Sequence, residues 1–433
     1  MRFAKRGFLL CLAISLTSLQ VHIATAQQER MPDNPAALTR VGDTVIKVND
    51  AIKMVLGFGN TFMVTTPEGN VIIDTSIAPH ARVHHRLLRA ESSAPIKYII
   101  LTHAHGDHIG GIPLWKEPGT QIIAQRNHIE FAHYQARLRG FFASRNAAQF
   151  GGNLAGQTGV AAGNFGAKIE PTILFDDKYE FTLGGVKFEV YRTPGETPDH
   201  LTVWVPQYKV AFTGDNYYES FPNIYTLRGT EPRWALEYVS SLNFVMGLKP
   251  AIVLPSHGRP IIGNAEIATR LTRYRDAILL VHDETVKGMN AGKDVYTLMR
   301  EIKLPAALDI GESYGKLSWS IRGIYEGYVG WFDLNPATMY ESPASSIYPD
   351  LVKLAGGPDA VVKLAIERVN AGQAVEALRL TDVVLAGEPG NKAALEARLK
   401  ALEILVSRCK NTNERGWLDY SVRTTKAKLG EAR

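Results

Sequence analysis

The chain has 433 residues, of which 45% are hydrophobic and 21% are charged, and its formal net charge is +5. This length allows two or three domains with a large core, and the composition is that of an ordinary soluble globular protein. No basic run is interleaved with aromatic residues, which argues against nucleic acid as a partner.

Residues 1–26 differ from the rest of the chain. The first six residues include three basic ones, residues 7–21 are mainly apolar, and residues 24–26 form a small-residue cleavage site. This pattern predicts a secretory signal peptide, and its apolar run is too short for a membrane span. We therefore expect a periplasmic or secreted protein that has no stable membrane anchor. Removal of the peptide lowers the net charge to +2 and leaves Cys409 as the only cysteine, so no intrachain disulfide is expected.

Short apolar segments separated by turn signals follow, and they predict strands at 54–56, 61–65 and 71–74. Asp74 ends an apolar run where a buried strand would approach a functional site, and we expect its carboxylate to orient a ligand there. The helix expected before the next strand carries His80, His84 and His85. We interpret these three as solvated histidines and not as a surface metal patch.

The stretch at 102–111 contains three histidines and an aspartate within six residues: His103, His105, Asp107 and His108. It follows residues 95–101, an apolar, β-branched run that predicts a buried strand. The four side chains therefore lie at the carboxyl end of a strand, where open sheets place their sites. His103 and His105 can point the same way in an extended chain, and Asp107 and His108 can face a second point after the turn. This arrangement suits two adjacent metal ions that share a bridging hydroxide.

Beyond this loop we predict a strand at 121–124 and a helix at 127–148 that carries His128 and His133, both interpreted as ordinary helix residues. Residues 140–167 contain seven glycines and no clear periodicity. Long loops of this kind are uncommon unless they are functional, so we expect a lid or wall over the site.

Three later strands each end in a glycine-containing loop that carries a carboxylate or a histidine. These loops lie at 193–200, 213–216 and 255–258. Their candidate ligands are Glu196 or His200, Asp215 and His257. From residue 295 onward the pattern is predominantly helical, with amphipathic candidates at 360–369, 374–386 and 391–407.

The stretch at 102–111 resembles the HxHxDH signature of the metallo-β-lactamase superfamily, and the later loops follow in that superfamily's motif order. The resemblance implies an α/β fold, an αββα sandwich with a dinuclear metal site. It assigns one metal to His103, His105 and Glu196, a second to Asp107, His108 and His257, and a bridging role to Asp215. Glu196 stands where a histidine is usual, and His200 is close enough to compete, so this choice stays open. Two Zn²⁺ ions are expected, and Mn²⁺ or Fe²⁺ stay open because a carboxylate ligand accepts harder metals.

The resemblance narrows to the alkyl sulfatases of this superfamily, which carry a glutamate at that place. Residues 223–229 are similar to their NxYTLRG segment, which implies substrate contacts from Asn223, Tyr225 and Arg228. A guanidinium also pairs bidentately with a tetrahedral oxyanion on chemical grounds alone. Residues 314–333 resemble the opening of the alkyl sulfatase dimerisation domain, which implies a homodimer. Without the resemblance, this aromatic segment predicts core or interface packing.

We therefore predict a signal peptide at 1–26, a catalytic domain at 27–290 and a helical dimerisation domain at 291–433. The predicted reaction is hydrolysis of a small organic (alkyl) sulfate ester by a metal-activated hydroxide, with Asp107, Asp215 and Arg228 as the catalytic residues. Hydrolysis of lactones, β-lactams or phosphoesters at the same metal site is the alternative, because function lies in the grafted loops. A non-catalytic exported binding protein is a third hypothesis. Phe150 lies near the place of a family tyrosine, which leaves the substrate class open.

Overall fold

The computed structural model describes residues 40–154 and 170–431. The predicted signal peptide and the second half of the predicted glycine-rich loop lie outside the described residues. Within the described part of the chain, no helix is long and apolar enough to cross a membrane.

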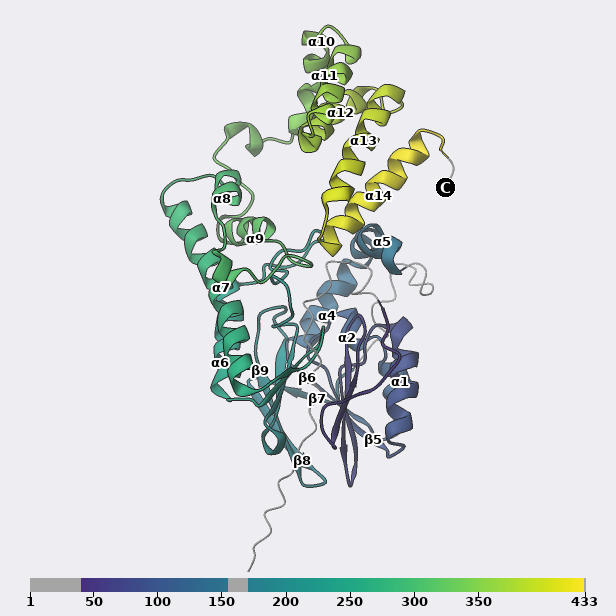
Figure 1. Cartoon of the computed structure of the whole chain (residues 1–433), viewed down its shortest axis with the longest axis vertical. Helices are drawn as coiled ribbons and strands as arrows, with labels where there is room; N and C mark the ends of the chain where they lie inside the picture. The colour runs from purple at the N-terminus through teal and green to yellow at the C-terminus, as the bar shows by residue number, and fades with distance from the viewer. Residues whose placement is uncertain (1–39, 155–169, 432–433) are drawn as a thin grey trace, which may run out of the picture. The chain divides into compact units, whose positions relative to one another are not determined.

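The strands of the described residues form two mixed sheets (Figure 1). The first has the order β1 (Ile46–Lys47), β2 (Ile52–Val55), β3 (Thr61–Thr66), β4 (Gly69–Ile73), β5 (Ile96–Ile100), β6 (Gln121–Gln125) and β7 (Ile173–Phe175), parallel from β4 onward. The second has the order β13 (Ile261–Ile262), β12 (Ile252–Pro255), β11 (Val210–Gly214), β10 (Leu201–Val205), β9 (Val186–Arg192) and β8 (Lys178–Leu183), antiparallel except for β11 and β12. The loops that carry the ligands at 103–108, Asp215 and His257 follow strands with a parallel neighbour, β5, β11 and β12, whereas the loop that carries Glu196 follows β9, whose two neighbours are antiparallel.

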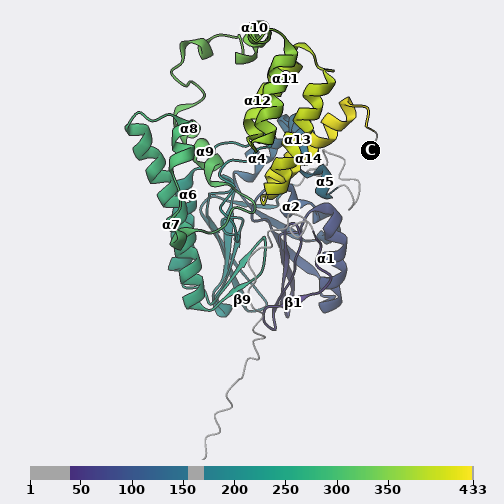
Figure 2. The ribbon, with the colours of Figure 1, turned by 45° about the horizontal axis from the view of Figure 1, so that its top comes forward.

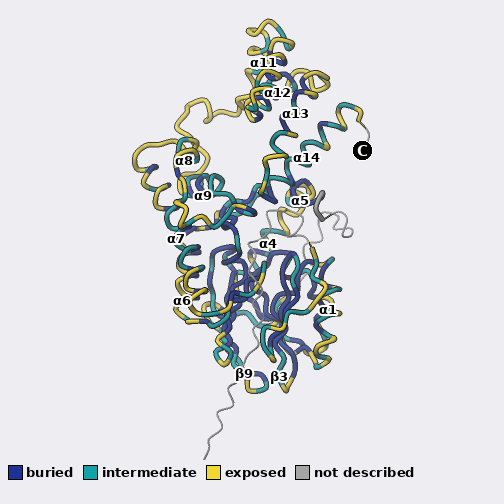
Figure 3. Tube along the Cα trace, in the orientation of Figure 1, coloured by how far each residue is buried: buried dark blue, intermediate teal, exposed yellow. Residues whose placement is uncertain are grey.

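Helices cover the outer face of each sheet (Figure 2). Helix α1 (Ala78–Glu91) covers the first sheet, and α6 (Ala235–Gly247) and α7 (Asn264–Asn290) cover the second. All five residues of β10 are buried because this strand is covered on both faces: Val203 points into the core between the sheets, and Trp204 packs against the helical layer. The predicted αββα sandwich is confirmed, and Figure 3 shows its strands as the buried part of the trace.

The interpretation of His80 and His84 as solvated is wrong, because both side chains are buried. His84 Nε2 donates a hydrogen bond to the carbonyl of Leu56 at 3.1 Å, and its Nδ1 lies 3.0 Å from Thr61 Oγ1. The ring therefore links α1 to strands β2 and β3. A periodicity argument cannot distinguish this role from a solvated one, because both partners lie more than twenty residues away in sequence.

The helix predicted at 127–148 is present as α4 (His128–Arg137) and the first part of α5 (Arg139–Leu154), so the expectation of a loop is wrong for residues 140–154. Helix α5 packs against the last helix, α14 (Thr412–Lys428), where Trp417 Nε1 donates to Gln149 Oε1 at 3.0 Å and Gln149 Nε2 donates to Asn413 Oδ1 at 2.7 Å. Gly416 allows this approach, since a Cβ there would collide with the Gln149 carbonyl. Tertiary contacts thus outweigh the glycine content of this segment.

The described chain is predominantly helical from residue 295 onward, as predicted. The remaining helices are α8 (Val295–Glu301), α9 (Leu317–Val329), α10 (Tyr348–Leu354), α11 (Pro358–Asn370), α12 (Ala374–Gly387) and α13 (Lys392–Arg408). The packing shows no break at residue 290, because Leu298 and Ile321 lie in one hydrophobic cluster with Ile278 of α7. The domain boundaries proposed from the sequence stay predictions.

Candidate metal centre

The predicted ligands gather at the carboxyl ends of the strands of both sheets. His103 and His105 lie in the loop after β5, and Asp107 and His108 lie in the short helix α2 (Gly106–Ile109). Asp215 follows β11 directly. Gly106 is the first residue of α2, so the chain turns at this glycine, as the sequence predicts.

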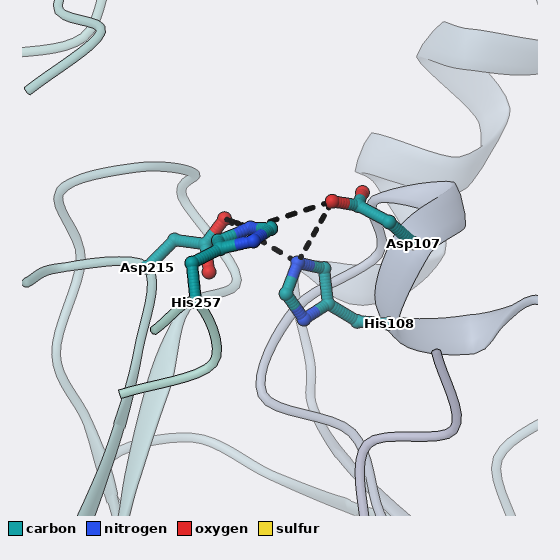
Figure 4. Close-up of side chains that lie close together, drawn as sticks. All are labelled: Asp107, His108, Asp215 and His257. Atoms are coloured by element: carbon teal, nitrogen blue, oxygen red, sulfur yellow. Dashed lines mark hydrogen bonds and ion pairs between the residues drawn. The ribbon is translucent and has the colours of Figure 1, made fainter. Parts of the chain in front are cut away.

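Two groups of potential ligand atoms each lie within 4.8 Å of one another: Asp107, His108, Asp215 and His257 form one, and His103, His105 and Asp215 form the other. Figure 4 shows the first group, with its ring nitrogens and carboxylates facing a common point.

Asp215 is the carboxylate common to both groups. Its Oδ2 lies 3.0 Å from His257 Nε2, 3.3 Å from His108 Nε2 and 3.7 Å from His103 Nε2. A single oxygen at the centre of three imidazoles is the arrangement that a bridging ligand requires.

The chemistry of this site fits a metal cofactor. His108 Nε2 and Asp215 Oδ1 are buried and have no hydrogen-bond partner within the described residues, which is costly unless another group satisfies them. His103 Nε2 and His105 Nδ1 converge to 2.9 Å. A set of imidazole nitrogens and carboxylate oxygens is the donor set that Zn²⁺ and similar divalent ions take.

The predicted ligands differ in how the site shifts their pKa values. Burial holds the pKa of His103 and of His105 well below the ordinary value, so both rings stay neutral, the form that binds a metal. Burial also opposes ionisation of Asp107 and Asp215, but the neighbouring imidazole of His108 outweighs it and holds the pKa of both carboxyls well below their usual range. Burial opposes protonation of His108 and His257, but the carboxylate of Asp215 outweighs it and raises the pKa of both rings, to about 10 for His257, so a metal would displace protons from these two nitrogens.

Asp74 orients His108 from behind, as expected from its position. Its Oδ2 accepts from His108 Nδ1 at 2.8 Å and from Ser256 Oγ at 2.7 Å, and its Oδ1 accepts from the Thr102 backbone N–H at 2.8 Å. The bond to Nδ1 fixes the tautomer in which Nε2 is free to bind a metal. Asp74 adopts a φ of 52°, a conformation that L-residues seldom adopt without a functional constraint.

The structure favours Glu196 over His200 as the candidate ligand. His200 Nδ1 donates to the Thr193 carbonyl at 2.9 Å, and its Nε2 accepts from the Asp215 backbone N–H at 3.0 Å, so neither nitrogen is free. Glu196 Oε1 lies 3.6 Å from His105 Nδ1. Glu196 is thus adjacent to the second group of ligand atoms, and its role as a ligand stays a prediction.

Two residues that hold Glu196 were missed by the sequence analysis. Arg233 Nη1 donates to Glu196 Oε1 at 2.5 Å and to the Asn223 carbonyl at 2.8 Å, and the Tyr238 hydroxyl donates to Glu196 Oε2 at 2.6 Å. Both residues are buried. Burial raises the pKa of Glu196, and the guanidinium of Arg233 opposes that rise. No sequence signal identifies these partners, which lie 37 and 42 residues from the glutamate.

The predicted sulfate-binding residues differ in their surroundings. Arg228 lines the cavity beside the metal centre, and its Nε has no partner within the described residues. Asn223 is buried with an unpaired Oδ1, and Tyr225 packs against Gly323 of α9. Neither Asn223 nor Tyr225 lines the cavity, so their predicted substrate contacts stay predictions.

The cavity has a volume of about 510 Å³ and opens onto the candidate ligands His105, Asp107 and Asp215. Its walls include the apolar side chains of Phe58, Ile77, Phe131, Phe142 and Phe150. Residues of α4 and α5 form much of this wall, so the described part of the predicted lid or wall, residues 140–154, is helical. A volume of this size suits a small organic ligand.

Comparison with known proteins agrees with this architecture. The sequence model of the metallo-β-lactamase superfamily matches residues 54–257, and that of the alkyl sulfatase dimerisation domain matches residues 296–426. A linear primary-alkylsulfatase from Pseudomonas sp. is 30% identical over 85% of this chain and 74% of its own length. An alkyl/aryl-sulfatase from Saccharomyces cerevisiae is 29% identical over 83% of this chain and 60% of its own length. A solved double mutant of the sec-alkyl sulfatase PisA1 superposes with a TM-score of 0.82 at 25% identity, over 90% of this chain and 67% of that chain.

The sandwich fold and the match to the superfamily model identify the protein as a metallo-β-lactamase superfamily member. The groups of ligand atoms at its strand ends indicate a metal cofactor. Within this superfamily, the chain belongs to the alkylsulfatase family. The family predicted from the sequence motifs is confirmed.

Proposed function

We propose that the protein is a metal-dependent hydrolase that cleaves organic sulfate esters. The observation that carries this proposal is the presence of Arg228 in the same cavity as the two groups of metal ligands. Arg228 can hold a tetrahedral oxyanion while the ester bond lies against the metal centre. The relatives named as alkylsulfatases support the same reaction class.

The proposed cofactor is a pair of Zn²⁺ ions. His103, His105 and Glu196 would hold one ion, Asp107, His108 and His257 would hold the other, and Asp215 would contact both. When bound, such ions supply a Lewis acid that lowers the pKa of water toward neutrality.

The protein's own residues supply binding and orientation. The backbone carbonyls of Leu227 and Arg228 accept hydrogen bonds from Arg145 at 2.6 and 2.7 Å, which holds the sulfate-binding segment against α5. The unpaired Arg228 Nε is then a donor available to a sulfate oxygen. The aromatic wall around Phe131 and Phe142 takes the carbon skeleton and excludes water from it.

A substrate profile tests this proposal. The metal-loaded protein is assayed with an alkyl sulfate, a lactone, a β-lactam and a phosphoester under identical conditions. We expect the sulfate ester to give the highest kcat/KM, because Arg228 is placed for an anionic tetrahedral group. A higher kcat/KM for a lactone or a phosphoester would replace the proposal with that alternative.

We also propose that the protein forms a homodimer through its C-terminal half, and that it is exported. The match to the alkyl sulfatase dimerisation model and the exposed aromatic side chains Tyr328 and Trp331 support the dimer. A monomer by light scattering across a concentration range would refute it. The signal-peptide pattern of residues 1–26 supports a periplasmic or secreted location, which cell fractionation tests.

A further inference from the structure

His128 lines the cavity outside the metal centre and is paired with the buried carboxylate of Asp199 behind it. His128 begins α4, and Asp199 lies just before β10. His128 Nδ1 lies 3.2 Å from Asp199 Oδ2, and both side chains are almost completely buried. Asp199 Oδ1 has no hydrogen-bond partner within the described residues. Burial of a carboxylate with a single partner is costly, so the pair is a built feature and not incidental packing.

The pairing fixes which nitrogen of His128 is available. A carboxylate only accepts, so Nδ1 carries the proton and donates it to Asp199. Nε2 makes no hydrogen bond in the part of the chain that the structure describes, and the side chain lines the cavity. His128 therefore presents one free, oriented hydrogen-bonding atom to the cavity, in the way that a carboxylate orients a functional imidazole in other enzymes.

The wall residues around His128 determine what a ligand in this part of the cavity would contact. The other wall residues of α4 include the apolar Ile129, Phe131 and Ala132 as well as the polar His133, Tyr134 and Gln135. Phe131 contacts the ring of His105 edge to face, with centroids 5.5 Å apart, which anchors this helix against the metal loop. A ligand that reaches from the metal centre along α4 therefore meets apolar and polar side chains, among which the ring of His128 is held by a buried carboxylate.

We propose that His128, held by Asp199, is a substrate-binding residue that hydrogen-bonds a hydroxyl group in the carbon skeleton of the substrate. A hydroxyl both donates and accepts, so it pairs with Nε2 whether or not that nitrogen carries a proton. The preferred substrate class is then the hydroxylated alkyl sulfates. The proposal deepens the proposed function and rests on it.

Binding of non-hydrolysable sulfonates tests the proposal independently of turnover. Dissociation constants are measured by calorimetry for an alkanesulfonate and for its positional hydroxyl isomers of equal chain length. We expect the native protein to bind at least one hydroxylated isomer about 10-fold or more tightly than the plain sulfonate, and His128→Phe to lose that preference while it keeps affinity for the plain sulfonate. His133→Phe is the matched control, because His133 also lines the cavity from α4 but is exposed and has no paired carboxylate.

Asp199→Asn provides a second variant that leaves the imidazole in place and removes its charged partner. It should reduce the hydroxyl preference, and circular dichroism verifies that each variant is folded. The proposal is overturned if the native protein prefers no hydroxylated isomer, or if the preference survives in folded His128→Phe. Hydrolysis of the corresponding sulfates is measured separately. If the protein prefers hydroxylated sulfonates but releases no sulfate, the role of His128 in binding stands and the proposed reaction is rejected.

Discussion

At the scale of single residues, the metal centre depends on side chains that hold the ligands from behind. Asp74 fixes the ring of His108, and Arg233 with Tyr238 fixes the carboxylate of Glu196. The sequence indicated Asp74, because it ends a strand that leads to the site. It gave no indication of Arg233 or Tyr238, because their importance comes from a contact made only in the folded chain.

Arg233→Met should weaken metal binding. The substitution leaves Glu196 buried without its guanidinium partner, and loss of a group that orients a ligand costs about 10- to 100-fold in metal affinity. Competition with a chromophoric chelator measures the affinity, and Arg233→Lys should recover part of it. Unchanged or tighter metal binding in Arg233→Met would show that Arg233 competes with the metal for Glu196.

Arg228→Ala should reduce turnover and leave metal content intact. The arginine has no role as a ligand, and removal of one donor to a developing anion typically costs about 100- to 1,000-fold in rate. Steady-state kinetics with an alkyl sulfate measures the loss of turnover, and metal analysis of the same sample checks that the metal content is unchanged. Arg126→Ala is the control, because Arg126 pairs with Asp176 on the surface. An unaltered kcat/KM in Arg228→Ala would remove Arg228 from the mechanism.

His84 should make the stability of the protein depend on pH. Burial lowers the pKa of His84 from 6.5 to about 3 in the folded state. Between these values the unfolded chain binds a proton that the folded chain does not, so stability is lost as the pH falls, by up to about 1.4 kcal/mol per pH unit. In His84→Gln, the free energy of unfolding in urea should fall less steeply between about pH 6 and pH 4. Equal slopes for the two proteins would contradict this assignment.

At the scale of elements, the sequence predicts the strands well and the cavity wall poorly. The strands that lead into the ligand loops can be recognised by their hydrophobic pattern and by the turn residues that follow them. Both signals depend only on residues that are close in the sequence. For the first part of α5 the sequence predicted both the end of a helix at 127–148 and the start of a loop at 140–167, and its last part was expected to be a loop because of its glycines. Its helical structure is stabilised by contacts with α14, more than two hundred residues later.

Gly416→Ala tests that contact. A Cβ at this position meets the Gln149 carbonyl, so α5 and α14 must separate, and overpacking of this kind costs about 1–3 kcal/mol. We expect a lower Tm and a higher KM, because α5 carries Phe142 and Phe150 of the cavity wall. Gly387→Ala in α12 is the matched control, since open space surrounds that position and the helix favours alanine. Equal Tm and KM values in the two variants would show that the packing of α14 against α5 affects neither stability nor the cavity wall.

At the scale of the whole molecule, the fold class and the family could be predicted because the metal motif has a specific spacing that few other sites share. The grouped ligands come from the three loops that follow β5, β11 and β12, each of which has a parallel neighbour, and they meet at the carboxyl ends of these strands. Polar pairs such as His128 and Asp199 could not be predicted, because each residue alone is ordinary in its segment. They are brought together by the packing of α4 against the loop before β10.

The central claim is that this site hydrolyses sulfate esters by means of bound metal. Its most direct test is sulfate release from dodecyl sulfate and from a secondary alkyl sulfate by the purified protein, with and without a chelator. We predict release from at least one ester, loss of release with the chelator, and recovery when the metal is restored. Absence of release from both esters with metal bound, or release that the chelator does not affect, would contradict the claim.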